Sequence, residues 1–371
     1  MGIMVGLPSP SGSEKDLQLN FGKNMTVQVE MRAPHLPAEW HMQSGIQLTW
    51  PHAGTDWAYM LQEVQECFVK IAKEIAEREL LLIVTPEPEE VKKQIGTVVN
   101  MDNVRFLKCA TNDTWARDHG AITMIDTGNP SLLDFTFNGW GLKFAAELDN
   151  QITKQAVEAR ALKGQYIDCL DFVLEGGSIE SDGMGTLLTT SECLLSPQRN
   201  GKLNQVEIEE YLKSTFHLQK VLWLDHGYLA GDDTDSHIDT LARFCSTDTI
   251  AYVKCTDEAD EHYEALLAME EQLKTFRTLA GEPYRLLALP MTDKIEEDGE
   301  RLPATYANFL ILNEAVLYPT YNQPENDRKA GEVLQQAFPK HQIIGIDCRA
   351  LIKQHGSLHC VTMQYPMGVL K

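Results

Sequence analysis

The 371-residue sequence has few basic residues for its length and no long apolar run. Lysine and arginine number 32 against 54 aspartate and glutamate, which gives a formal net charge of -22. Such a chain is a poor partner for nucleic acid, whose binding depends on neutralising phosphates. No stretch approaches the roughly 18 to 20 apolar residues of a membrane span. We therefore expect neither a nucleic-acid nor a membrane partner. The charge suits a cationic ligand, although solubility alone is the simpler explanation of it.

The sequence also lacks paired cysteines, a secretory signal and a long linker. Its eight cysteines include no CxxC pair, which argues against a zinc ribbon and a thioredoxin-type motif. The first residues carry no basic segment and only a short apolar run, so a reducing cytoplasm is the expected location. No tract rich in proline, glycine and serine follows residue 35. We expect residues 1–35 to form a partly flexible N-terminal extension and residues 36–371 to form one domain.

Helical and strand patterns alternate along the chain. Apolar residues recur at helical spacing across residues 56–80, and a buried strand ended by prolines follows. The sequence predicts further strands at 105–111, 121–126, 221–224, 249–253, 285–289, 309–318, 343–347 and 358–365. It predicts further helices near 151–163, 204–216, 258–277, 326–338 and 348–354. Short apolar strands between amphipathic helices favour a mixed α/β fold, and no clean internal repeat is visible in the sequence.

Two segments combine an acid with turn-forming glycines. Asp118 follows Trp115-Ala116-Arg117, and in an extended chain it would share a face with the small Ala116. Glu175 precedes Gly176-Gly177, a pair that lets the backbone approach a ligand closely. Each segment alone is explained as simply by an ordinary turn.

A third segment, residues 232–239, is rich in aspartate and contains His237. On a strand, His237 and Asp239 would share one face while Ile238 enters the core. A proton shuttle beside a carboxylate follows from that arrangement. Binding of a divalent cation and capping of a strand are equally good explanations locally, although the ligand order of an EF-hand is absent.

The fourth segment, Gly356–Cys360, places a cysteine in polar, glycine-flanked surroundings, whereas most other cysteines lie in apolar runs. The adjacent His359 would point to the opposite face of a strand, so we expect it to be a bystander. The remote His237 is the better partner for the thiol, because such pairs are neighbours in space rather than in sequence.

Together, one cysteine, one histidine and three acids suit chemistry on a guanidinium group, which is planar, cationic and resonance-stabilised. Two carboxylates can hold its N–H groups in bidentate geometry. A thiolate is a strong nucleophile near neutral pH, and a histidine can protonate departing ammonia and then activate water. The candidate catalytic residues are Cys360, His237, Glu175, Asp118 and Asp239.

Nine short segments carry a resemblance to a known family. In order, they are Leu36–Trp40, Leu48–Pro51, Trp115–Asp118, Phe137–Gly141, Glu175–Gly177, Gly185–Thr190, Asp233–Asp239, Tyr306–Phe309 and His359–Thr362. In this order and spacing the chain resembles the agmatine deiminases and the Porphyromonas-type peptidylarginine deiminases of the guanidino-group-modifying superfamily. The resemblance covers nearly the whole chain after the extension.

The resemblance implies a single deiminase domain folded as a five-bladed, pseudo-symmetric α/β propeller with the site on its axis. It implies that Cys360 is the nucleophile, that His237 is the general acid and base, and that Glu175 supports His237 and the substrate. Asp118 and Asp239 would clamp the guanidinium. Further substrate-binding positions implied by the resemblance are Trp115, Asn308 and, for a distal ammonium, Asp233.

The implied activity is that of a hydrolase acting on C–N bonds of linear amidines, without metal or cofactor. Agmatine would give N-carbamoylputrescine and ammonia, a step towards putrescine and the polyamines, and relatives suggest a homo-oligomer. Gly356, Ser357 and Ser236 depart from the usual family pattern. A deiminase acting on peptidyl-arginine or another guanidine is therefore the alternative. A non-catalytic polyamine- or calcium-binding protein is the alternative of another class.

Overall fold

The computed structural model describes residues 34–126 and 129–371. The chain divides into two units, Met1–Met31 and Arg32–Lys371, and every described residue belongs to the second. Almost all of the predicted extension, residues 1–35, therefore lies outside the described residues.

Five sheets in the described residues share one pattern of strand pairing. In each sheet the first strand is antiparallel to the second, and the second is parallel to the third. Their strand orders are β18 (Thr362–Pro366), β1 (Gln43–Thr49), β2 (Leu80–Thr85) and β3 (Val104–Lys108); β4 (Ile122–Met124), β5 (Ser131–Thr136) and β6 (Gln165–Val173); β7 (Ile179–Ser181), β8 (Thr186–Thr190) and β9 (Lys220–Leu224); β10 (Ala242–Ser246), β11 (Thr249–Lys254) and β12 (Arg285–Pro290); and β15 (Leu310–Ile311), β16 (Ala315–Thr320) and β17 (Gln342–Asp347). The backbone thus repeats one arrangement of three strands, called the repeated unit below, which is not visible as a repeat in the sequence.

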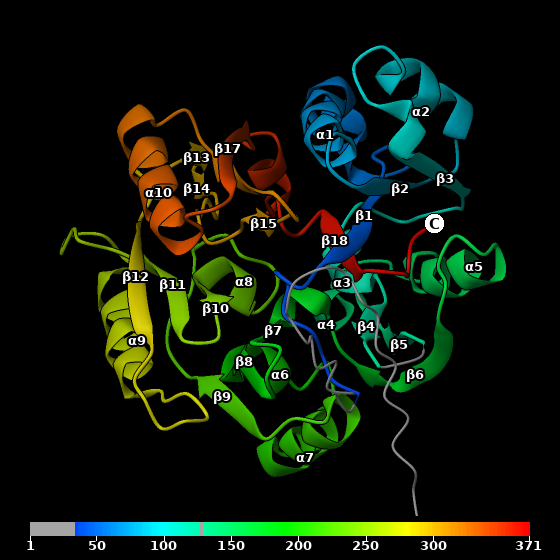
Figure 1. The fold of residues 1–371 in the computed structure, drawn as a ribbon. Coiled ribbons are helices and arrows are strands. Elements are labelled where there is room, and N and C mark those ends of the chain that lie inside the picture. Colours follow the sequence, from blue (N-terminus) through cyan, green and yellow to red (C-terminus); the bar gives the residue numbers. More distant parts are fainter. Residues whose placement is uncertain (1–33, 127–128) are drawn as a thin grey trace, which may run out of the picture. The chain divides into compact units, whose positions relative to one another are not determined.

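Long helices join the parallel strands within each unit, as parallel pairing requires. Figure 1 shows each of them beside the strands that it connects. They are α1 (Leu61–Ala76), α2 (Pro88–Ile95), α5 (Ile152–Glu158), α7 (Gln205–Phe216), α9 (Tyr263–Thr275) and α10 (Pro324–Ala337). In α1, Val64, Phe68, Ile71 and Ile75 are buried at helical spacing, so the predicted periodicity marks the face that packs on the sheet.

Shorter elements occupy turns within and between these units. They are the helices α3 (Ala116–His119), α4 (Gly139–Leu142), α6 (Ser191–Leu194) and α8 (Ile238–Leu241), the 3-10 turns η1 (Asp56–Met60), η2 (Met101–Asn103), η3 (Asp149–Gln151), η4 (Gly176–Ser178) and η5 (Leu351–Gln354), and the small hairpin of β13 (Glu296–Glu297) and β14 (Glu300–Arg301). Contacts link α3 to η4 and to β18, and α8 to η4. Segments far apart in sequence therefore meet at these turns.

The first sheet is built from both ends of the described chain. β18 pairs antiparallel with β1, with Thr362 opposite Leu48, and β1 continues parallel to β2. The strand predicted at 358–365 begins only at Thr362, which leaves the preceding residues in a turn. No helix in the described part of the chain is long and apolar enough to cross a bilayer.

Candidate active site

The proposed catalytic residues and Asn308 share one location in the repeated unit. Each lies in the turn before the first strand of a sheet, so that each of the five sheets with three or more strands supplies at least one of them. Asp118 precedes β4, Glu175 precedes β7, His237 and Asp239 precede β10, Asn308 precedes β15, and Cys360 precedes β18. The structure therefore brings together residues that the sequence spreads over more than two hundred positions.

The Cys360 thiol is buried and faces an amide and a carboxylate. Its Sγ donates to Asn308 Oδ1 at 3.3 Å and lies 4.0 Å from Asp239 Oδ2. Asn308 Oδ1 also accepts from the backbone N–H groups of His359 and Cys360, at 2.8 and 3.3 Å. Burial, followed by the charges of Asp239 and Asp118, raises the pKa of Cys360 well above its usual value. The thiol is therefore neutral in the unliganded protein near pH 7.

Asp118 lies in the helical turn α3, and the extended conformation expected around it is wrong. The turn hydrogen-bonds to itself through Gly120 N and Ala116 O at 2.9 Å, so alternate side chains do not share a face. Asp118 Oδ2 accepts from Trp140 Nε1 at 2.9 Å, and Oδ1 accepts from Gly177 N at 3.0 Å. Burial and the neighbouring charge of Asp239 raise the pKa of Asp118 despite these two donors.

His237 and Asp239 lie at the start of α8, so the prediction that they share a strand face is also wrong. Ile238 is buried, as expected. His237 Nδ1 is 3.7 Å from Asp118 Oδ1, while Nε2 has no hydrogen-bond partner among the described residues. Burial lowers the pKa of His237 to about 3, so its imidazole is neutral at physiological pH. The described contacts of the Cys360 thiol do not include this imidazole.

Gly177 explains why a glycine pair follows Glu175. A β-carbon at Gly177 would lie 2.7 Å from His237 Nδ1, 2.8 Å from Asp118 Oδ1 and 3.1 Å from Asp239 Oδ2. Three polar side chains therefore converge on a position that has room for a hydrogen atom only. This close approach favours the site over an ordinary turn as the reason for the motif.

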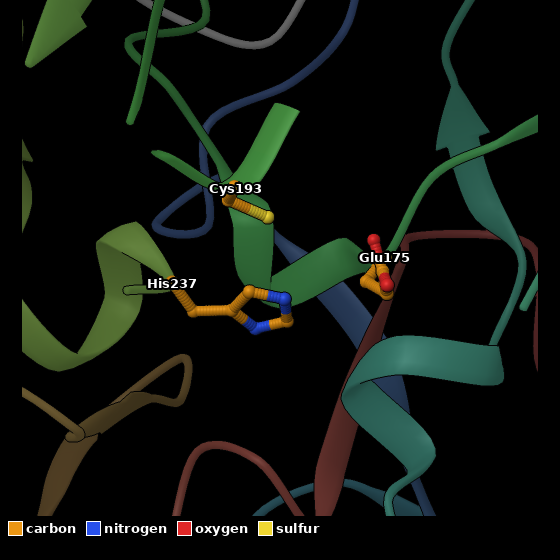
Figure 2. Close-up of side chains that lie close together, drawn as sticks. All are labelled: Glu175, Cys193 and His237. Atoms are coloured by element: carbon orange, nitrogen blue, oxygen red, sulfur yellow. The ribbon is translucent and has the colours of Figure 1, made fainter. Parts of the chain in front are cut away.

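Glu175 is fully buried and forms an ion pair with a residue that the sequence did not single out. Both of its carboxylate oxygens accept from Arg199 Nε, at 2.9 and 3.0 Å. Burial raises the pKa of Glu175, and the Arg199 guanidinium opposes that rise. Figure 2 shows Glu175 together with His237 and Cys193, whose ligand atoms lie within 4.8 Å of one another. A metal ion bound there would have to share Glu175 with the guanidinium.

A cavity is lined by Cys360, Asp118, Trp115 and Asp233, four of the predicted residues. Trp115 donates from its indole N–H to Asp113 Oδ2 at 2.9 Å. Asn308 is fully buried and does not line this cavity; its side chain holds the Cys360 turn instead.

The cavity lining is acidic away from the thiol. Asp56, Asp113 and Asp233 line it, and its described residues include no lysine or arginine. Burial raises the pKa of Asp113 to about 6, which still leaves it mostly ionised at pH 7. His355, whose Nε2 lies 3.9 Å from Asp233 Oδ2, is the one titratable base in the lining. Such a cavity attracts cations.

Residues 35–366 match the sequence profile of the family described as Porphyromonas-type peptidyl-arginine deiminase. The chain belongs to this family. Members of it are hydrolases that act on C–N bonds of linear amidines, and this chain is one of them. The resemblance inferred from the nine segments is thereby confirmed.

Individual members of the family resemble the chain over nearly its whole length. A Marinomonas protein provisionally named agmatine deiminase is 32% identical over 351 residues, which cover 89% of this chain and 94% of that protein. The C. jejuni agmatine deiminase with bound substrate superposes with a TM-score of 0.84 at 39% identity, covering 94% of this chain and all of that one. A Porphyromonas gingivalis protein provisionally named arginine deiminase gives a TM-score of 0.86 at 50% identity, covering 91% and 100%.

Several residues that shape the site received no role from sequence reasoning. Trp140 binds Asp118, and Arg199 binds Glu175. His359, expected to be a bystander, donates from Nδ1 to Asp239 Oδ2 at 2.7 Å. Trp140 and His359 lie in the family segments Phe137–Gly141 and His359–Thr362, so the resemblance pointed to both residues without giving them a role in the site.

Proposed function

We propose that this chain hydrolyses a guanidine substrate to a ureido product and ammonia, with agmatine as the preferred substrate and N-carbamoylputrescine as the product. The observation that carries the proposal is the meeting of the Cys360 thiol, Asp118 and Asp239 beside an acidic cavity. A planar cation entering this cavity would find a nucleophile and two carboxylates suited to its N–H groups.

The first half of the reaction forms a covalent intermediate. The bound cation offsets the carboxylate charges around Cys360 and favours loss of the thiol proton, which passes to the neutral His237. The thiolate adds to the guanidinium carbon, and His237 returns the proton to the departing nitrogen, which leaves as ammonia. A Cys360 thiouronium remains, held by Asp118 and Asp239.

The second half releases the product. His237, neutral again, accepts a proton from a water molecule as that water adds to the thiouronium carbon. Collapse of the adduct breaks the C–S bond and forms the ureido carbonyl, and the hydroxyl proton passes to the departing thiolate. His237 gives its proton to the released ammonia, which leaves as ammonium. General acid and base help of this kind contributes about 100- to 10,000-fold to the rate. Glu175, within 4.8 Å of His237 and paired with Arg199, would keep the imidazole in place.

The acids that line the cavity favour agmatine over free arginine. Asp233 would face the distal ammonium of agmatine, whereas the α-carboxylate of free arginine would meet Asp56, Asp113 and Asp233 without a cation to pair with. Peptidyl-arginine lacks that carboxylate and is the second candidate, because the description of the matching family names it.

The repeated sheets support a finer statement about the fold. We propose that the five units are the blades of a pseudo-symmetric propeller in a single domain of residues 36–371. Their common strand order and the common placement of the site residues favour it. A homo-oligomer and a cytoplasmic location stay predictions.

Ammonia release from agmatine, arginine and a blocked arginine peptide tests the activity. We expect turnover to be fastest with agmatine and lost in Cys360→Ala, while Cys169→Ala, which removes a buried thiol from β6, keeps it. No ammonia from any substrate would refute the activity, and turnover by Cys360→Ala would refute the nucleophile.

Asp233→Asn tests the substrate. We expect the KM for agmatine to rise about tenfold while that for the blocked peptide changes little, because only agmatine carries a distal charge. The exposed Asp257→Asn is the charge-matched control outside the cavity. Equal effects of Asp233→Asn on both substrates would contradict the assigned role.

A further inference from the structure

His359, next to the proposed nucleophile, lies between two buried carboxylates. Its Nδ1 is 2.7 Å from Asp239 Oδ2, and its Nε2 is 2.7 Å from Glu39 Oε2. The ring is almost completely buried, and so are both acids. Asn308 Oδ1 fixes the backbone of this turn by accepting from His359 N at 2.8 Å.

These contacts favour the doubly protonated form of His359. A neutral imidazole carries one N–H and can donate to one carboxylate only, whereas an imidazolium donates to both. Because each ring nitrogen lies at hydrogen-bond distance from a carboxylate oxygen, the doubly protonated form satisfies both acids. Two short charge-assisted hydrogen bonds then join Glu39, His359 and Asp239 in a row.

Other buried charges face this row from several elements. Arg243 of β10 donates to Glu39 Oε2 and lies 3.1 Å from His359 Nε2. Its Nε pairs with Glu180 of β7, and its guanidinium stacks on Phe309 at 4.6 Å. The remaining charged or titratable groups that face His359 or Asp239 are Arg117 of α3, which donates to His359 O at 3.5 Å, Asp118 of α3, Asp232, His237, and the thiol of Cys360.

The row acts on the two acids at its ends. Burial alone would raise the pKa of Glu39, but Arg243 and then His359 hold it well below its usual range. Burial would likewise raise the pKa of Asp239, and the hydrogen bond and charge of His359 outweigh that effect. Asp239 Oδ2 is held by His359, while Oδ1 is buried without a hydrogen-bond partner among the described residues. That oxygen is available to a substrate N–H.

We infer that Glu39 and His359 are positioning residues for the proposed deimination: Glu39 holds His359 as an imidazolium, and His359 keeps Asp239 ionised and oriented with Oδ1 free for the guanidinium. The inference rests on the proposed function for its kinetic consequence only, because the charge on His359 can be measured without a substrate. Asp118, which has no such partner, is expected to depend on the substrate for its ionisation.

Two variants remove the charge while keeping the hydrogen bond to Asp239. In Glu39→Gln the imidazolium loses its second carboxylate, and in His359→Asn an amide N–H replaces Nδ1–H. Both remove the imidazolium charge beside Asp239 and leave Arg243 as the nearby cation, so Asp239 becomes protonated at higher pH. We expect the acid limb of the kcat/KM profile to move to higher pH, with at least tenfold lower kcat/KM at pH 5.5 and a much smaller loss at pH 8.

Asp260→Asn provides a matched control. Asp260 also joins a histidine and an arginine, accepting from His262 Nδ1 at 2.7 Å and from Arg301 at 2.8 Å, but it does not line the active-site cavity. We expect this variant to lower the melting temperature without moving the acid limb. If Glu39→Gln and His359→Asn also lower the melting temperature but leave the acid limb unchanged, the row has only a structural role and the inference is overturned.

The second measurement is nitrogen-15 NMR of histidine-labelled wild-type protein, with the His359 signals assigned by their loss in His359→Asn. We expect both ring nitrogens of His359 to be protonated at pH 7, and one of them to lose its proton in Glu39→Gln. A neutral His359 in the wild type would overturn the inference even if a variant fails to fold. Absence of deiminase activity would refute the proposed function and leave the NMR result standing as an independent test of the charge.

Discussion

Gly177→Ala is the sharpest test of the site geometry, because one methyl group meets three functional side chains. The added carbon would lie 2.7 Å from His237 Nδ1, where ordinary contact begins near 3.4 Å. His237 or the backbone must therefore move by about 0.7 Å, and Asp118 Oδ1, at 2.8 Å, must move by nearly as much. Alanine keeps the N–H that donates to Asp118 Oδ1 at 3.0 Å, but moving this oxygen away from the added carbon lengthens that hydrogen bond.

The expected loss follows from these displacements. Overpacking of a buried position costs about 1–3 kcal/mol of folding stability. A displacement of about 1 Å at reacting groups costs roughly 100-fold in rate, so we expect kcat/KM to fall about 10- to 100-fold. The loss should appear mainly in kcat, because His237 and Asp118 are the residues proposed to act in the chemical steps.

Steady-state ammonia release from agmatine, together with urea denaturation, measures both effects. Gly345→Ala in β17 is the matched control: its β-carbon would lie 2.7 Å from the Thr320 methyl group, an equal crowding in a strand that carries none of the candidate residues. We expect this variant to lose stability and keep kcat/KM. Wild-type kcat/KM in a folded Gly177→Ala protein would refute the close convergence of the three side chains.

Three further predictions concern single groups. Trp140→Phe removes the buried indole donor from Asp118, so the pKa of Asp118 rises further. We expect kcat/KM to fall about 10- to 100-fold, with the largest loss at low pH. An unchanged pH profile of kcat/KM would contradict a role for this contact. The Cys360 thiol, whose pKa is raised, should react slowly with iodoacetamide at pH 7 and at least tenfold faster when methylguanidine is present. Cys360→Ala gives the background reaction of the other cysteines. If methylguanidine slows the reaction, the idea that a bound cation promotes ionisation of Cys360 is contradicted. Burial raises the pKa of Glu79 from 4.5 to about 8, so ionisation of Glu79 opposes folding as the pH rises between these values. In urea titrations, wild type should lose on the order of 3 kcal/mol of unfolding free energy between pH 5 and pH 8, and Glu79→Gln should lose much less. Equal losses in the two proteins would contradict the raised pKa of Glu79.

The parts of the fold that the sequence predicted are those with a regular period. The helix at 56–80 appears as η1 and α1, and the predicted strands at 249–253 and 343–347 lie within β11 and β17. Periodicity extends over enough residues in these segments to be read directly. The strand predicted at 309–318 is instead a hairpin, β15 and β16, because Asn313 and Glu314 turn the chain between two apolar runs.

The short helical turns that hold the candidate residues were the least predictable elements. The turns α3 and α8 have four residues each, too few to show a helical period, so the residue pattern predicts an extended chain at both. Residue type and the family segments still identified Cys360, His237 and the acids. Contacts between distant segments, such as Arg199 with Glu175, leave no local pattern in the sequence.

The placement of one site group before each sheet has a consequence for dividing the protein. A cut at the exposed turn around Gly281, where a side chain would meet nothing within 4 Å, separates Asp118, Glu175, His237 and Asp239 from Asn308 and Cys360. Neither fragment could then complete the proposed catalytic cycle, since the proposed base lies in one and the proposed nucleophile in the other. Fused to two interacting partners, such fragments would form a reporter in which the proposed deiminase activity registers only their reunion.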